Sequence, residues 1–137
     1  MDAEDHVNAA HDPAAELATL GACLASKGAR VEARRHITGS DFYDPRYEAI
    51  WDVMARLDRH KRNVDPTTVL AALGKSTAVE VMPDVVTSTG IPDHVDEYAA
   101  IVRSWAIRRR LLDEAIHTQQ IALNPEANAQ GRTMAAY

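Results

Sequence analysis

The side chains that could perform chemistry in this chain are few: six histidines, one cysteine, the carboxyl group of Glu16 and a Gly-Lys-Ser triplet. The histidines show no pairing at three or four residues with one another or with Cys23, the spacing that places two metal ligands on one helix face. Cys23 lies on the apolar face of a helical pattern, which favours a buried thiol over a nucleophile. Glu16 has no second carboxylate at matching spacing, which favours a hydrogen-bonding or surface role over acid catalysis. We therefore expect no catalytic residue, no metal site and no cofactor.

The triplet Gly74-Lys75-Ser76 matches the end of a phosphate-binding loop. The complete motif needs a glycine five residues before Gly74, where this chain has Val69, and a strand before the loop. Here a helical pattern ends at the glycine, so a helix C-cap is the better interpretation. Without this loop the chain is not expected to be an enzyme by itself.

Basic side chains gather at residues 34–35, 59–62 and 108–110. The net charge of −5 argues against avid nucleic-acid binding by the whole surface, and most basic runs on helices are solvated faces. Arg103, Arg108 and Arg110 nevertheless offer possible nucleic-acid contacts on one helical pattern. A small nucleic-acid-binding regulator is therefore an alternative function.

Three Asp-Pro pairs each precede an apolar pattern of helical spacing, and each is typical of an N-cap followed by the first helical residue. They predict helices that begin at Pro13, Pro45 and Pro66. The first helix should end near residues 27–28, and a short helix should follow over about residues 29–37. Residues 78–86 are ambiguous, with a short helix broken near Pro83 preferred over a strand, and residues 87–90 form a linker.

Four of the seven aromatic residues lie between Phe42 and Trp51. This concentration predicts a helix held in the core by its rings. Gly21, in the first helix, permits close approach of a neighbouring helix. The expected core anchors are Leu20, Gly21, Phe42, Tyr43, Tyr47 and Trp51.

The longest uninterrupted pattern runs from Pro92 to about Leu123 and predicts one long helix. Its apolar positions alternate in steps of three and four, as in a heptad seam. The first half can pack on its own domain, whereas the second half needs a partner. The residues expected in self-association or partner binding are Val95, Tyr98, Val102, Trp105, Arg109, Leu112 and Ile116.

A chain of 137 residues with 46% hydrophobic composition is long enough for one domain with its own core. A single cysteine favours a reducing compartment, and no apolar run reaches the length of a membrane span. We expect a cytoplasmic protein without membrane contact. Its expected parts are a flexible acidic N-terminus (1–12), a helical bundle (13–90), a long helix (91–124) and a tail or truncated return helix (125–137).

Four blocks in order resemble the N-terminal domain of the bacterial replicative helicase family of the DnaB type. They are Glu16-Leu17-Ala18-Thr19-Leu20-Gly21-Ala22-Cys23-Leu24, the stretch from Asp41-Phe42-Tyr43 to Trp51, Val64-Asp65-Pro66-Thr67-Thr68-Val69, and Tyr98-Ala99-Ala100-Ile101-Val102-Arg103. The likeness covers roughly residues 13–125.

This resemblance implies an all-α bundle of about six helices whose last helix leads into a helical hairpin, here truncated. In the family, this domain forms a collar of paired subunits and meets primase and loading factors, while the motor lies in a separate domain. The resemblance thus implies a non-catalytic oligomerisation and interaction module of DNA replication, a homodimer or higher oligomer that binds primase or a loader, with nucleic-acid binding weak or indirect. The helicase-binding region of a primase, with a similar helical topology, is a further alternative.

Overall fold

The computed structural model describes residues 10–124 and residue 126. Most of the expected acidic N-terminus (1–12) and almost all of the expected tail or return helix (125–137) therefore lie outside the described residues. The expectations for these two segments remain predictions.

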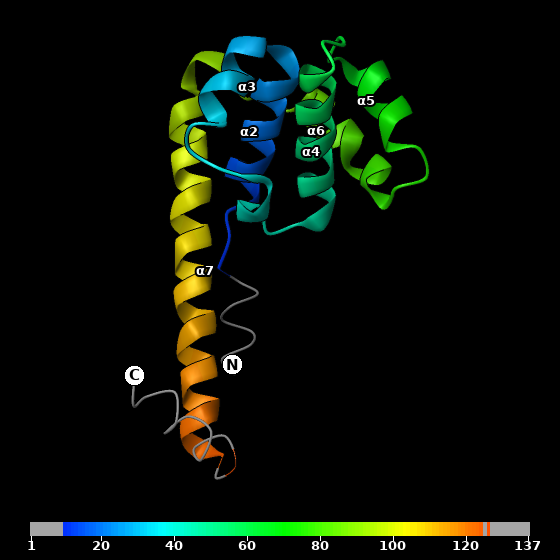
Figure 1. Cartoon of the computed structure of the whole chain (residues 1–137). Coiled ribbons are helices and arrows are strands. Elements are labelled where there is room, and N and C mark those ends of the chain that lie inside the picture. The colour runs from blue at the N-terminus through cyan, green and yellow to red at the C-terminus, as the bar shows by residue number, and fades with distance from the viewer. Residues whose placement is uncertain (1–9, 125, 127–137) are drawn as a thin grey trace. The chain divides into compact units, whose positions relative to one another are not determined.

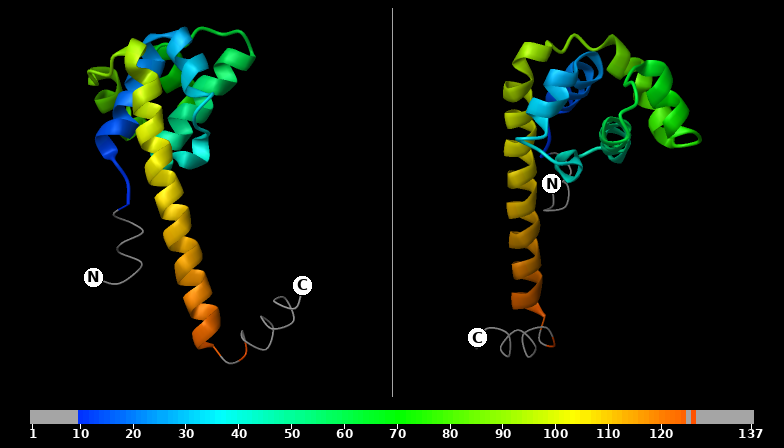
Figure 2. Two further views of the ribbon diagram at one scale, coloured as in Figure 1. Left: turned by 90° about the vertical axis from the view of Figure 1, so that its left-hand side faces the viewer. Right: turned by 45° about the horizontal axis from the view of Figure 1, so that its top comes forward.

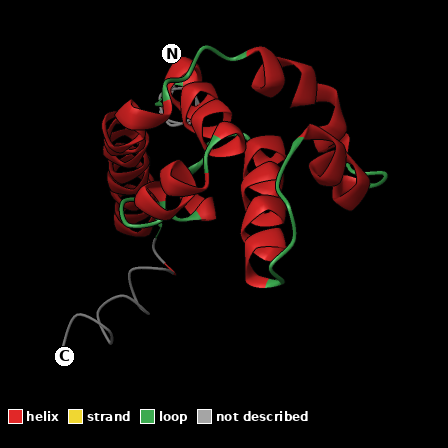
Figure 3. Cartoon of the chain, turned by 90° about the horizontal axis from the view of Figure 1, so that it is seen from above, coloured by secondary structure: helices red, strands yellow, loops and turns green. Residues whose placement is uncertain are grey.

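The described part of the chain consists of helices and connecting loops without a strand, as Figure 3 shows, which confirms the all-α prediction. The α-helices within it are α2 (Pro13–Ala25), α3 (Lys27–Ala33), α4 (Pro45–Arg59), α5 (Pro66–Leu73), α6 (Met82–Thr87) and α7 (Val95–Leu123), labelled in Figure 1. Three short 3-10 helices join them: η1 (Gly39–Asp41), η2 (Thr77–Val81) and η3 (Pro92–His94).

The chain divides into two compact units, and the division falls inside α7. One unit comprises residues 11–106 and holds the bundle. The other comprises residues 1–10 and 107–137, of which the second part of α7 is described.

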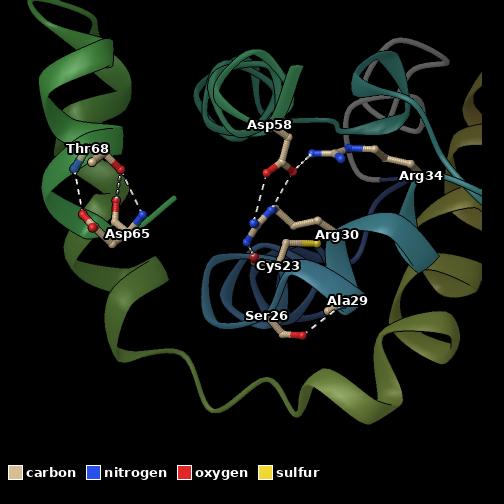
Figure 4. Close-up of polar contacts among 8 residues, drawn as sticks. All are labelled: Cys23, Ser26, Ala29, Arg30, Arg34, Asp58, Asp65 and Thr68. Carbon is tan, nitrogen blue, oxygen red and sulfur yellow. Dashed lines mark hydrogen bonds and ion pairs between the residues drawn. The ribbon is translucent and has the colours of Figure 1, made fainter. Parts of the chain in front are cut away.

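The three Asp-Pro pairs begin helices as predicted, because each aspartate accepts a hydrogen bond from a free N–H of the first turn. Asp12 Oδ1 accepts from the Ala15 N–H at 3.0 Å, and Asp44 Oδ1 accepts from the Arg46 N–H at 2.9 Å. Asp65 Oδ1 accepts from the Thr68 N–H at 2.8 Å, and Thr68 Oγ1 accepts in return from the Asp65 N–H at 2.9 Å. The reciprocal pair is a capping box, drawn in Figure 4.

The boundary between the first two helices differs from the prediction. α2 ends at Ala25 and α3 spans Lys27–Ala33, so the expected end at 27–28 and the expected helix over 29–37 are wrong by several residues. The reason is Ser26, whose extended backbone (φ −148°) interrupts the helix and whose hydroxyl caps α3 by accepting from the Ala29 N–H at 3.1 Å.

Residues 77–87 form η2 followed by α6, so the preferred helical interpretation is confirmed and the strand alternative is wrong. Pro83 lies in the first turn of α6, where a missing N–H costs nothing. Likewise α7 begins at Val95 and not at Pro92, because residues 92–94 form the 3-10 turn η3.

The core of the bundle is built around α2, which contacts α3, α4 and α6; α4 in turn contacts α5 (Figures 1 and 2). Leu20 is fully buried, and the rings of Phe42 and Trp51 pack with centroids 5.4 Å apart, as expected of core anchors. Tyr47 is only half-buried and packs against the edge of this core, whereas the half-buried Tyr43 stacks on the His11 ring with centroids 3.9 Å apart.

The close approach predicted at Gly21 is present, but the nearest atoms belong to the residue that follows α6, and the helix itself is farther away. A Cβ placed there would lie 2.6 Å from the Cβ of Ser88, in the linker that follows α6. That linker, residues 88–91, can be followed between α6 and η3 in Figure 2. The linker therefore packs directly against the backbone of α2.

Candidate functional site

The Glu16 carboxyl group and the Cys23 thiol, the two groups considered for catalysis, are both buried. The Glu16 side chain is 2% exposed and accepts a hydrogen bond from the Tyr43 N–H at 3.0 Å, so its carboxylate ties α2 to the aromatic segment. The Cys23 side chain is buried, and this burial raises the pKa of the thiol to about 12. A thiol protonated at neutral pH is a poor nucleophile. Both observations agree with the roles inferred from the sequence.

The Gly-Lys-Ser triplet ends a helix as predicted. Gly74 is the C-cap residue of α5 with φ 58°, and its N–H donates to the Leu70 carbonyl at 3.2 Å. Among the residues that the structure describes, no group of three or more His, Cys, Asp or Glu side chains could hold a metal ion.

The first part of the predicted seam faces the bundle's own core. Val95 and Val102 are 2% and 1% exposed and belong to the hydrophobic cluster of residues 11–106. Tyr98 is half-buried, and its hydroxyl accepts from the Ile91 N–H at 3.1 Å. Trp105 is also half-buried. Val95, Tyr98 and Val102 stabilise the bundle, so the predicted residues that remain for self-association or partner binding are Trp105, Arg109, Leu112 and Ile116.

The second part of α7, residues 107–123, carries exposed apolar side chains. Leu112, from the predicted seam, is 36% exposed, and Ile116 is half-buried. Three further apolar side chains of this part, outside the predicted site, are exposed by 42%, 65% and 76%: Ile107, Leu111 and Leu123. A monomeric protein rarely exposes so many large apolar side chains in one short segment. We define residues 107–123 as the distal segment of α7.

The arginines predicted to contact nucleic acid differ in the contacts of their side chains. Arg103 Nη1 lies 3.8 Å from Oδ2 of the buried Asp41, so this guanidinium helps to hold α7 against η1. Arg108 and Arg110 are exposed on α7. Arg109 is half-buried, and its Nη1 donates to the Ala10 carbonyl at 3.0 Å.

An ion cluster between α3 and α4 was missed in the sequence. Asp58 accepts from Arg30 Nε at 2.8 Å, from Arg30 Nη2 at 3.1 Å and from Arg34 Nη2 at 2.6 Å (Figure 4). Arg30 Nη1 also donates to the Cys23 carbonyl at 2.9 Å. The sequence signal was the presence of two arginines four residues apart in a short helical pattern. Because the partners are 24 and 28 residues apart in the chain, spacing alone could not have paired them.

The fold defines the class of protein: it is an all-α bundle whose last helix is long. The family model described as "DnaB-like helicase N terminal domain" matches residues 8–104, and the chain belongs to this family. The match is confined to the helicase N-terminal domain, which is non-catalytic, and no ATPase domain is covered. No helix in the described part of the chain is long and apolar enough to cross a membrane.

Two curated relatives are replicative DNA helicases DnaB. The protein of Leifsonia xyli subsp. xyli is 29% identical over 122 residues, and that of Mycobacterium leprae is 26% identical over 130 residues. These alignments cover 85% and 90% of this chain but only 27% and 21% of the relatives. The chain thus spans about a quarter of the length of the helicases it matches.

Solved structures share the fold. The N-terminal domain of DnaB helicase from Mycobacterium tuberculosis superposes with a TM-score of 0.79 at 24% identity, covering 89% of this chain and 94% of that one. The N-terminal domain of DnaB helicase from Helicobacter pylori, described with its interactions with primase, gives a TM-score of 0.75 at 18% identity, covering 90% and 100%. The order of helices predicted from the four sequence blocks is therefore that of a known domain.

Proposed function

We propose that this chain is the partner-binding N-terminal domain of a bacterial replicative helicase, that it self-associates through the distal segment of α7, and that it binds primase or a loading factor. Membership of the DnaB N-terminal family supports the replication role, and it favours the helicase over the helicase-binding region of a primase. Primase is the partner described for the Helicobacter pylori domain of the same fold. Such a protein works in the bacterial cytoplasm, where we place it.

The observation that carries this proposal is the exposure of Leu111, Leu112 and Leu123 along one helix segment. Burying an exposed leucine against a partner gains about 25 cal/mol for each Å² of apolar surface removed from water. A helix segment with exposed apolar side chains also gains order when it acquires a neighbour. Both effects favour association through the distal segment.

A titration calorimeter can test partner binding. Primase of the same bacterium is titrated into the wild-type chain and into the double variant Leu112→Asp with Ile116→Asp. We expect the double variant to bind at least about tenfold more weakly, because two buried apolar contacts would be replaced by charges. The matched control is Leu70→Asp, at a 39% exposed leucine on α5, which should bind as the wild type does. If neither primase nor a loading factor gave heat of binding when titrated into the wild-type chain, the partner-binding role would be refuted.

A further inference from the structure

A basic pocket lies where the end of α4 meets the junction of α2 and α3. Its volume is about 560 Å³, and its cationic lining residues are Lys27, Arg30, Lys61 and Arg62. The remaining wall includes the aliphatic side chains of Leu24, Ala25 and Val64. A second hollow of about 530 Å³ lies on the other side of Arg62 and adds Arg56 and His60. We call the first hollow the α4-end pocket.

The positive charge of the α4-end pocket is not neutralised from within. Asp58 is the carboxylate of its lining, and this group already accepts hydrogen bonds from Arg30 and Arg34 (Figure 4). Among the described residues, no ion pair involves Lys27, Lys61 or Arg62. This concentration of free cations occurs in a chain whose net charge is −5. The pocket is thus a local positive field on an acidic protein.

Lys61 occupies a position that usually holds glycine. The Arg62 N–H donates to the Leu57 carbonyl at 2.9 Å, and the Lys61 N–H donates to the Asp58 carbonyl at 3.0 Å, which together form a Schellman motif after α4. Lys61 takes the left-handed backbone conformation of this motif, with φ 56°. A side chain at this position costs free energy that glycine would avoid. The motif holds an ammonium group at the rim of the pocket despite that cost.

Helix electrostatics explain only part of this charge. Cations near the end of a helix stabilise it, which accounts for Arg56 and Arg59 in the last turn of α4. Lys27, however, is the first residue of α3, where the helix dipole disfavours a cation. Helix stability therefore does not explain the positive charge of Lys27.

We propose that the α4-end pocket binds an acidic segment of a partner protein, whose carboxylates contact Lys27, Lys61 and Arg62 while an apolar side chain packs on the aliphatic wall. The volume is that of a site for a few side chains. No aromatic side chain lines the α4-end pocket, so bases of a single strand would find no aromatic stacking surface in it. The acidic net charge also repels a long polyanion such as duplex DNA. The proposal does not depend on association through α7.

Fluorescence anisotropy of the full chain can test the proposal with three labelled probes of equal length. They are a Glu-Leu copolymer peptide, the same peptide with Gln in place of Glu, and oligo-dT. We expect the Glu peptide to bind and the Gln peptide to bind at least about tenfold more weakly. The double variant Lys27→Glu with Arg62→Glu should weaken the Glu peptide by about tenfold or more. Failure of the Glu peptide to bind at low salt would overturn the proposal.

Two controls separate this site from general surface charge and from unfolding. Arg35→Glu with Lys75→Glu changes the net charge by the same amount at exposed positions outside the pocket and should leave Glu-peptide binding within about twofold. Equal weakening by this control would overturn the proposal, as would tighter binding of oligo-dT that is lost in the pocket variant. Lys61→Gly removes one pocket charge at a position that favours glycine, so weaker peptide binding by this well-folded variant would support the proposal.

Discussion

At the residue scale, two residues with a positive φ follow the ends of neighbouring helices, but only one of them has a side chain. Lys61 (φ 56°) follows α4, and Gly74 (φ 58°, ψ −115°) follows α5. The Gly74 conformation lies outside the regions that residues with a Cβ adopt, whereas the αL conformation at Lys61 is only mildly unfavourable. Glycine is thus required after α5, whereas the corresponding residue after α4 is a lysine.

Exchanging these side chains should change stability in opposite directions. We expect Lys61→Gly to raise the free energy of unfolding by about 0.5–1 kcal/mol, because it relieves the backbone conformation. Gly74→Ala should lower it by about 1–2 kcal/mol, because the added Cβ is incompatible with that conformation. Urea unfolding followed by tryptophan fluorescence measures both. A loss of stability in Lys61→Gly would mean that its side chain makes a stabilising contact.

At the element scale, the Asp58 cluster joins α3 to α4. The Arg30 and Asp58 side chains are 8% and 13% exposed, so removing the carboxylate would leave a buried guanidinium without its charge partner. We expect Asp58→Asn to lower the free energy of unfolding by about 2–3 kcal/mol. Asp52→Asn, at an exposed position of the same helix, is the matched control and should change stability by less than about 0.5 kcal/mol. Equal effects of the two variants would refute the structural role of the cluster.

The same cluster predicts a pH dependence. Burial raises the pKa of Asp58, but the hydrogen bonds and charges of Arg30 and Arg34 outweigh burial and hold the pKa below its usual range. A carboxyl group with a lowered pKa in the folded state contributes its stability above the unfolded value of about 4 and loses it as the pH falls through the folded value. Unfolding curves below about pH 4 should therefore lose stability more steeply for the wild type than for Asp58→Asn.

The sequence predicted the elements better than their boundaries or their contacts. The Asp-Pro caps, Gly74 and the spacing of α7 are local signals, and the structure confirms each of them. Ser26 is also a local signal, but a serine inside an apolar pattern is compatible with both a continuous helix and a new cap. The ion cluster and the burial of Val95 and Val102 depend on which helices pack together, which spacing does not encode. For that reason Val95 and Val102 are named among the partner-binding residues, although the first half of the helix is expected to pack on its own domain.

At the scale of the whole molecule, candidate binding surfaces belong to different units of the chain. The α4-end pocket lies in the unit of residues 11–106, and the distal segment of α7 lies in the other unit. The pocket is basic, whereas the distal segment presents exposed leucines. Association through α7 and binding of an acidic segment therefore use different residues and can be tested with separate variants.

Light scattering coupled to size exclusion, over a range of concentrations, tests the central claim that the domain self-associates through the distal segment. At about 100 µM we expect the wild type to have the mass of a dimer or a larger oligomer. The variant Leu112→Asp with Ile116→Asp should be a monomer of about 15.0 kDa with an unchanged helical circular dichroism spectrum. Leu70→Asp should associate as the wild type does. A wild-type chain that remains a monomer at every concentration would show that the domain does not self-associate through the distal segment.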